Sequence, residues 1–73
     1  MNDEAAMALA LEEAKLALRH GDVPVGAVVV SGEEVLARRH NQRELRKDPT
    51  AHAELLALQD AARARDSWRL DGL

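Results

Sequence analysis

The stretch VPVGAVVV, Val23 to Val30, limits most strongly what this chain can fold into. The run is apolar without alternation, whereas a strand with one solvated face alternates apolar and polar residues. A continuous apolar run predicts a strand that is covered on both faces, as in layered α/β proteins. Pro24 must lie near the start of this strand or at a bulge, because proline cannot donate to a ladder. We therefore expect helices on both faces of a sheet that contains Val23–Val30.

A helix is predicted before this strand, from about Asp3 to Arg19. Asn2 is the expected N-cap, and Gly21 can take the left-handed conformation that ends a helix. His20 suits the negative end of the helix dipole and is assigned no function. Helical spacing predicts that the buried stripe of this helix consists of Met7, Leu11, Ala14 and Leu18.

A hairpin is predicted after the apolar strand. The turn SGEE, Ser31–Glu34, is followed by a return strand VLARRH, Val35–His40. The short connection makes the pair antiparallel. The next segment, NQRELRKDPT, Asn41–Thr50, is predicted to be a polar loop.

A second helix is predicted from about Ala51 to Ala64. Asp48 or Thr50 is expected to cap it. Its predicted buried stripe consists of Ala51, Leu55, Leu58 and Ala62.

These elements make an incomplete α/β fold. Two strands form a marginal sheet, and Val23–Val30 needs neighbours on both edges. The chain has 73 residues and no cysteine, so a disulfide cannot compensate for the small core and no thiolate ligand is present. We expect the missing strands to come from another chain, from a swapped copy or from a C-terminal part that this sequence does not contain.

The charges are unevenly distributed along the chain. The segment RRHNQRELRK, residues 38–47, holds five of the ten bases and a single acid, Glu44. Such a segment can contact phosphate, although on charge alone a solvated loop is the better interpretation. The N-terminal segment is acidic, unlike a secretory signal, and no segment is long and apolar enough to span a membrane. We therefore expect a cytoplasmic protein.

The start of the second helix carries His52 and Glu54 within DPTAHAELLAL. Residues two apart point to nearly opposite sides in mid-helix, but first-turn side chains lean back towards the electropositive helix end. A neutral His can bind zinc and a Glu can carry protons for a zinc-bound water, but catalytic zinc takes three protein ligands. On the tripeptide HAE alone, a His that caps a loop and a Glu that stabilises the helix start are the better interpretation.

Four segments in order, DVPVGAVVV, RRHNQRE, DPTAHAELLAL and SWRL, resemble the bacterial tRNA-specific adenosine deaminases of the cytidine-deaminase-like superfamily. Zinc deaminases carry the signature H-x-E followed later by P-C-x-x-C. The resemblance implies that residues 1–73 are the N-terminal portion of a single deaminase domain. This portion would be the helix-strand-strand-helix part of a three-layer α/β/α fold. The implied reaction is zinc-dependent hydrolytic conversion of adenosine to inosine in tRNA, at the anticodon wobble position.

The resemblance also implies roles for individual residues. His52 is expected to be a zinc ligand, and Glu54 the general acid/base. The expected substrate contacts are Asn41, Val25 and Ala53, although Asn41 could instead serve a turn and Val25 the core. The nucleic-acid contacts expected in the basic segment are Arg43, Arg46 and Lys47.

The chain differs from the family pattern because the P-C-x-x-C segment is absent. The remaining zinc ligands are therefore not in this chain, which alone is expected to be inactive. The implied partners are tRNA and either a second copy in a homodimer or a complementing C-terminal segment. Two other interpretations stay open. One is a deaminase of the same superfamily that acts on another nucleobase or nucleoside, and the other is a non-catalytic fragment.

Overall fold

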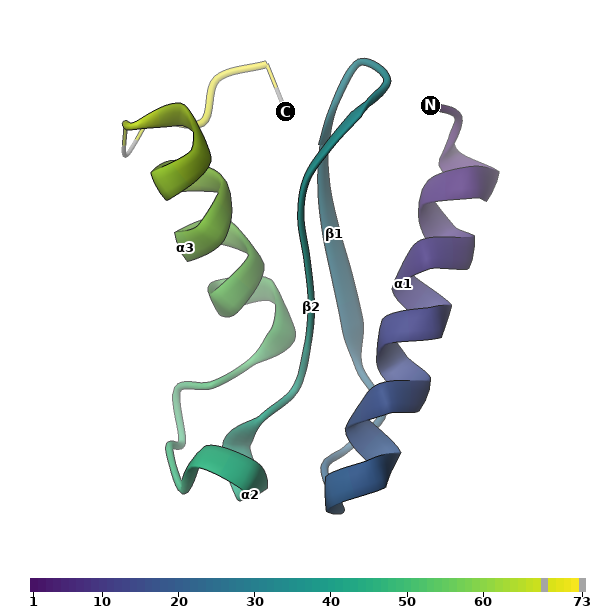
Figure 1. Ribbon diagram of the computed structural model, residues 1–73, viewed down its shortest axis with the longest axis vertical. Helices are drawn as coiled ribbons and strands as arrows, with labels where there is room; N and C mark the ends of the chain where they lie inside the picture. The colour runs from purple at the N-terminus through teal and green to yellow at the C-terminus, as the bar shows by residue number, and fades with distance from the viewer. Residues whose placement is uncertain (68, 73) are drawn as a thin grey trace.

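The computed structural model describes residues 1–67 and 69–72, so Trp68 of the SWRL segment and Leu73 lie outside the described residues. The two strands form one antiparallel sheet, and a long helix covers each of its faces (Figure 1). The elements in chain order are α1 (Asp3–Ala17), η1 (Leu18–His20), β1 (Gly26–Ser31), β2 (Glu34–His40), α2 (Arg43–Arg46) and α3 (Ala53–Arg65). The prediction that both faces of the apolar strand are covered is confirmed. Within the described ranges, every helix is too short or too polar to cross a membrane.

Helix α1 begins where the sequence predicts, but it ends at Ala17, before the predicted Arg19, and the turn η1 continues the helical segment to His20. The Asn2 side chain accepts a hydrogen bond from the Ala5 backbone N–H at 2.8 Å. After the short turn η1, Gly21 adopts a left-handed φ of 76° and ends the helical segment. This turn directs the chain back towards the sheet.

The predicted buried stripe of α1 is wrong. Three of its four members are more than half exposed, namely Met7, Leu11 and Leu18. Glu13 and Ala17 are buried instead. The cause is the close approach of α1 to β1 at Gly26, where a Cβ atom would overlap the carbonyl oxygen of Ala10. Such an approach leaves room only for small side chains, so alanines face the strand and the long apolar side chains point outward.

The predicted hairpin is confirmed, with a later start of its first strand. Strand β1 begins at Gly26, because Val25 donates a hydrogen bond to the Val23 carbonyl at 2.8 Å and residues 23–25 form a tight turn around Pro24. Val28 pairs with Arg38, and a bulge lies between Val29 and Val30.

The segment predicted to be an irregular polar loop contains the short helix α2. Four residues do not form a stable helix by themselves. The first turn of α2 is held by the Asp22 carboxylate, which accepts hydrogen bonds from the backbone N–H groups of Glu44 and Leu45. The interaction is remote in sequence, so local propensity does not reveal it.

Helix α3 begins at Ala53, not at the predicted Ala51, and His52 occupies its N-cap position. Neither predicted cap is correct. The Asp48 carboxylate instead accepts hydrogen bonds from the backbone N–H and the hydroxyl of Thr50, which closes a turn before the helix.

The predicted buried stripe of α3 is wrong for its two leucines, although Ala51, just before the helix, is buried as predicted. Leu55 and Leu58 are partly exposed, and the buried helical residues are Ala53, Leu56, Ala57 and Ala61. Ala57 and Ala61 form the core cluster with Ala37 of β2. As with α1, small side chains let the helix lie close to the sheet, and the leucines predicted to be buried face away from it.

Candidate active site

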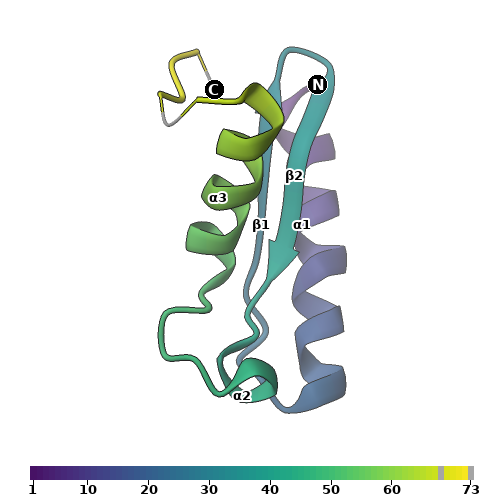
Figure 2. The same cartoon turned by 60° about the vertical axis from the view of Figure 1, so that its left-hand side comes forward.

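The residues predicted to form a site gather at the end of the sheet that lies opposite the hairpin turn (Figure 2). His52 precedes α3 and has an extended backbone, with φ −78° and ψ 143°, while Glu54 lies in the first helical turn. His52 therefore does not follow helical spacing, and the two side chains can meet. His52 Nδ1 lies 3.9 Å from Glu54 Oε1, and the two side chains are 38% and 61% exposed.

The imidazole of His52 does not cap α3, since its side chain makes no capping hydrogen bond. Its ring remains accessible beside a carboxylate at a helix N-terminus. This is a position where free N–H groups and the helix dipole favour negative charge.

Asn41 performs the capping role. Its side chain is buried, with the residue 5% exposed, and its Oδ1 accepts a hydrogen bond from the Ala53 backbone N–H at 2.8 Å. That bond fixes the orientation of the amide, because only the oxygen can accept from an N–H group. The Nδ2 group faces the other way and makes no hydrogen bond to any described residue. It is available to donate to a bound molecule.

Backbone hydrogen bonds connect the remaining predicted residues to Asn41. The Asn41 N–H donates to the Val25 carbonyl at 3.1 Å, so Val25 lies beside Asn41 at the edge of the site. Ala53 is fully buried, and its N–H is already used by Asn41. The structure thus brings Val25, Asn41, His52, Ala53 and Glu54 to one end of the molecule.

The basic segment divides into two parts with different environments. Arg38 pairs with Glu12 and Glu13 across α1, and Arg39 pairs with Asp60 of α3. These two bases hold the helices to the sheet. Residues 42–51, hereafter the basic loop, carry the other three bases, Arg43, Arg46 and Lys47. All three are exposed, and no ion pair engages them among the described residues.

A backbone hydrogen bond joins the two ends of the basic loop. The Gln42 N–H donates to the Ala51 carbonyl at 2.9 Å, which joins the two ends of the loop directly before His52. The loop is therefore continuous with the predicted site at both ends, through Asn41 and His52.

Two buried carboxylates were missed in the sequence. Burial alone would raise the pKa of Asp22, but hydrogen bonds from Glu44, Leu45 and His20 outweigh burial and lower it. The pKa of Glu13 is likewise lowered, because hydrogen bonds from His40 and Arg38 outweigh its burial. A sequence signal exists for Glu13: it lies on the same helical face as Ala10 and Ala17, which face the sheet.

A group of three or more potential metal ligands does not occur in residues 1–67 and 69–72. His20 and His40 do not supplement His52, since their Nδ1 atoms bind Asp22 and Glu13. The described residues offer one accessible imidazole beside one carboxylate. This set can hold and transfer a proton, but it does not by itself make a zinc site.

Comparisons with known proteins find deaminases. The profile of the MafB19-like deaminase family matches residues 1–73. The tRNA-specific adenosine deaminase of Bacillus subtilis (strain 168) is 47% identical over 70 residues, which cover 96% of this chain and 44% of that protein. A solved structure from a study of A-to-I editing by tRNA:A34 deaminases matches with a TM-score of 0.89 at 40% identity, covering 94% of this chain and 53% of that one. Guanine deaminase from B. subtilis matches with a TM-score of 0.91 at 33% identity, covering 99% of this chain and 46% of that one.

The fold prediction is thereby confirmed: the chain has the α/β architecture of the cytidine-deaminase-like fold. The chain spans about half the length of the proteins that it matches.

Proposed function

Because the chain belongs to the MafB19-like deaminase family, we propose that it is the N-terminal portion of a deaminase domain that converts adenosine to inosine in tRNA. The observation that carries this proposal is the convergence of three groups at the start of α3. These are the accessible His52 imidazole, the Glu54 carboxylate, and an Asn41 amide whose N–H₂ group makes no hydrogen bond to the residues that the structure describes. The residues named in this proposal supply proton transfer and base recognition.

Each of these groups has a specific role in the proposal. Glu54 is the proton carrier, which holds a proton at its carboxylate and delivers it to a ring nitrogen of the base. The Asn41 Nδ2 group donates a hydrogen bond to an acceptor on the base, while Val25 forms a wall of the pocket. Ala53 contributes as the backbone position that Asn41 fixes, since its own N–H is occupied.

Zinc is part of the proposal as the cofactor of the complete site, with His52 as one of its ligands. His52 alone does not fit a zinc ion, since catalytic zinc takes three protein ligands and the chain has no cysteine. The remaining ligands would therefore come from outside residues 1–73, from a complementing segment or a second copy. Purified chain, dialysed and analysed for metal, is expected to retain no stoichiometric zinc; one firmly bound zinc per chain would contradict this.

The tRNA substrate is supported by the basic loop. Arg43, Arg46 and Lys47 are exposed and form no ion pair among the described residues, although Arg46 helps to lower the pKa of Asp48, and all three lie next to the proposed pocket. Free bases and nucleosides do not need three cations outside the pocket, whereas an anticodon stem-loop presents phosphates there. A cytoplasmic location is also part of this proposal. A homodimer remains part of this proposal, since a second copy is one source of the missing strands.

A second candidate is a deaminase of a free base, favoured by the similarity to guanine deaminase from B. subtilis. The experiment that separates the two uses this chain, complemented with the segment that its relatives carry beyond the matched half. The complemented protein is incubated with zinc and either an anticodon stem-loop RNA, free adenosine or free guanine. We expect inosine in the RNA alone. Turnover of guanine or adenosine would favour the second candidate, and no turnover of any substrate would favour a non-catalytic fragment.

A further inference from the structure

Asp22 is buried at the junction of η1 and β1, and its carboxylate is fully engaged, with the residue 4% exposed. Its Oδ1 accepts a hydrogen bond from the Glu44 N–H at 2.8 Å, and its Oδ2 accepts one from the Leu45 N–H at 3.2 Å. Both donors belong to the first turn of α2, which has no partner for these groups within the helix. Gln42, at the N-cap position of α2, provides no side-chain cap. The carboxylate of Asp22, which is distant in sequence, thus caps α2 in place of a neighbouring side chain.

Asp22 is itself held firmly. Its backbone N–H donates to the Ala17 carbonyl at 3.1 Å, and His20 Nδ1 lies 2.6 Å from its Oδ2. The left-handed Gly21 between them turns the chain so that the carboxylate points towards α2. Through these contacts the basic loop is anchored to the end of α1, which packs along the whole sheet (Figure 1).

The anchored turn carries the cations of the basic loop. Arg43 directly precedes the two amides that Asp22 binds, and Arg46 and Lys47 directly follow them. We propose that Asp22 is a positioning residue that holds Arg43, Arg46 and Lys47 in the arrangement that contacts RNA. This inference rests on the proposed function, because it requires that the basic loop contacts RNA.

The proposal separates substrate binding from chemistry. The base of the loop is closed by the Gln42–Ala51 hydrogen bond and by the Asn41–Ala53 hydrogen bond, and neither involves Asp22. Loss of the Asp22 carboxylate therefore frees the cations but leaves the start of α3 in place. RNA affinity should fall while the chemical step continues at its normal rate.

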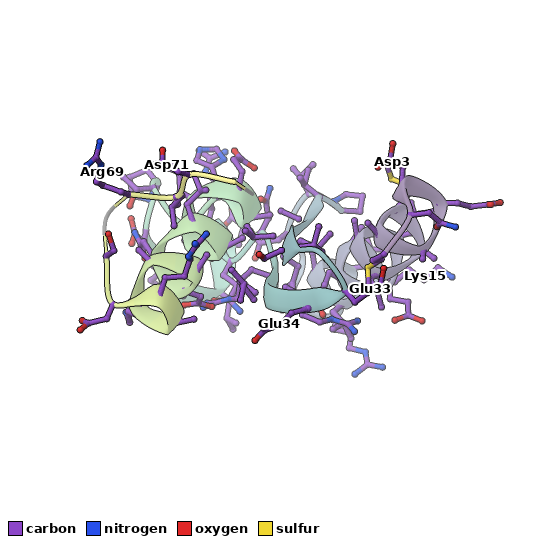
Figure 3. The ribbon with its side chains drawn as sticks, turned by 90° about the horizontal axis from the view of Figure 1, so that it is seen from above. Asp3, Lys15, Glu33, Glu34, Arg69 and Asp71 are labelled. Atoms are coloured by element: carbon purple, nitrogen blue, oxygen red, sulfur yellow. The ribbon has the colours of Figure 1, made fainter. Side chains whose placement is uncertain are left out.

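The test compares Asp22→Asn with Glu34→Gln in the complemented protein. Asparagine keeps the shape of Asp22 but replaces one of its two acceptor oxygens with an N–H₂ donor, which cannot accept from the amide that this oxygen binds. Glu34→Gln also removes one carboxylate charge, but Glu34 lies at the hairpin (Figure 3), which is at the far end of the molecule from α2 (Figure 1). The measurements are the hydrogen exchange of the Glu44 and Leu45 amides, the salt dependence of binding to an anticodon stem-loop RNA, and KM and kcat.

For Asp22→Asn we expect faster exchange of both amides, a several-fold higher KM and a kcat close to that of the parent. The slope of log K against log salt should flatten by about 0.7 for each lost phosphate contact on a single strand. Glu34→Gln should change none of these. Faster exchange with an unchanged KM and salt slope would overturn the proposal, because Asp22 would then stabilise α2 without positioning the cations.

Two further variants make the result decisive. An Arg43→Ala, Arg46→Ala, Lys47→Ala triple variant should flatten the salt slope, and adding Asp22→Asn to it should change the slope no further. If the triple variant keeps the parent slope, the basic loop does not contact RNA, and the RNA part of the proposed function fails together with this inference. If the triple variant has a shallower salt slope than the parent and adding Asp22→Asn makes the slope shallower still, only the role of Asp22 is refuted. Should Asp22→Asn not fold, His20→Ala removes one support of Asp22 and should raise KM in the same way; an unchanged KM would count against the proposal.

Discussion

Replacing Asn41 separates its two roles, as the cap of α3 and as a donor to the substrate. Asn41→Ala removes the acceptor for the Ala53 N–H, which is buried and 2.8 Å away. Loss of an N-cap costs about 0.5–2 kcal/mol, and an unsatisfied buried N–H group costs about 1–3 kcal/mol. Both ranges refer to the same hydrogen bond and are therefore not added. We expect the free energy of unfolding to fall by about 2 kcal/mol.

Asn41→Asp should behave differently. Its carboxylate still accepts from the Ala53 N–H, and its negative charge suits the positive end of α3. It cannot donate, so the proposed hydrogen bond from Nδ2 to the base is lost. We therefore expect near-parental stability with a large loss of deamination for Asn41→Asp, and a loss of both for Asn41→Ala.

Thermal melting and inosine formation by the complemented protein test this prediction together. About 2 kcal/mol corresponds to a fall in Tm of roughly 4–8 °C for a protein of 150–250 residues. Asn2→Ala is the matched control, since the Asn2 side chain also accepts a backbone N–H hydrogen bond at 2.8 Å at the start of a helix, but Asn2 is exposed and belongs to the other long helix. It should lower Tm slightly and leave activity intact. The reasoning is refuted if Asn41→Ala melts like the parent, or if Asn41→Asp retains full activity.

Three further outcomes are expected. Gly26→Ala should lower the free energy of unfolding in urea by at least about 3 kcal/mol, because its Cβ would overlap the Ala10 carbonyl. Gly32→Ala, which has open space but a φ of 59°, should lower it by about 1–2 kcal/mol. A larger loss for Gly32→Ala than for Gly26→Ala would contradict the packing of α1 on β1. The pKa values of Glu13 and Asp22 lie below their ordinary 4.5 and 3.8. As the pH falls, these carboxylates are protonated in the unfolded chain at a higher pH than in the folded chain, so the free energy of unfolding should decrease below about pH 5. A free energy of unfolding that stays constant from pH 6 to pH 3 would show that these carboxylates contribute little. The chain alone should associate with rising concentration in sedimentation experiments, since β1 has one partner strand and a groove of about 470 Å³ lies between α1 and β1; a concentration-independent mass of 8.0 kDa with a sharp melt would refute this.

The sequence predicts the features that depend on local chemistry. The Asn2 cap, the Gly21 stop and the short hairpin all follow from the preferences of a few neighbouring residues, and all are confirmed. The prediction that helices cover both faces of the apolar strand is also correct for β1, whereas Val23 and Val25 precede the strand and are exposed. These predictions need no information from distant parts of the chain.

Features that depend on distant contacts were missed. The leucines of both helices fit an amphipathic pattern, yet Leu11 and Leu58 face outward, because close contacts at Gly26 and Ala37 select alanines for the sheet side. Helix α2 was missed because its first turn is held by Asp22, which is 22 residues from Glu44 in sequence.

The site illustrates the same division. The residue types of His52 and Glu54 and their position at a helix start were recognisable from the sequence. Their extended-then-helical backbone, which lets two side chains two residues apart meet, was not. The capping bond from Asn41 was also hidden, since the sequence suggested Asp48 or Thr50 as the cap.

The most direct test of the central claim is a comparison of Glu54→Gln with His52→Ala in the complemented protein, with inosine in tRNA and bound zinc measured on the same samples. Glutamine keeps the size of Glu54 but cannot accept and return a proton. General acid/base groups contribute about 10²–10⁴-fold in rate, so Glu54→Gln should lose activity by that factor while it keeps its zinc and its affinity for RNA. His52→Ala should lose zinc and activity together, because it removes a ligand. A Glu54→Gln protein that turns over near the parent rate, or a His52→Ala protein that keeps its zinc, would contradict the assignment of this helix start as half of a deaminase site.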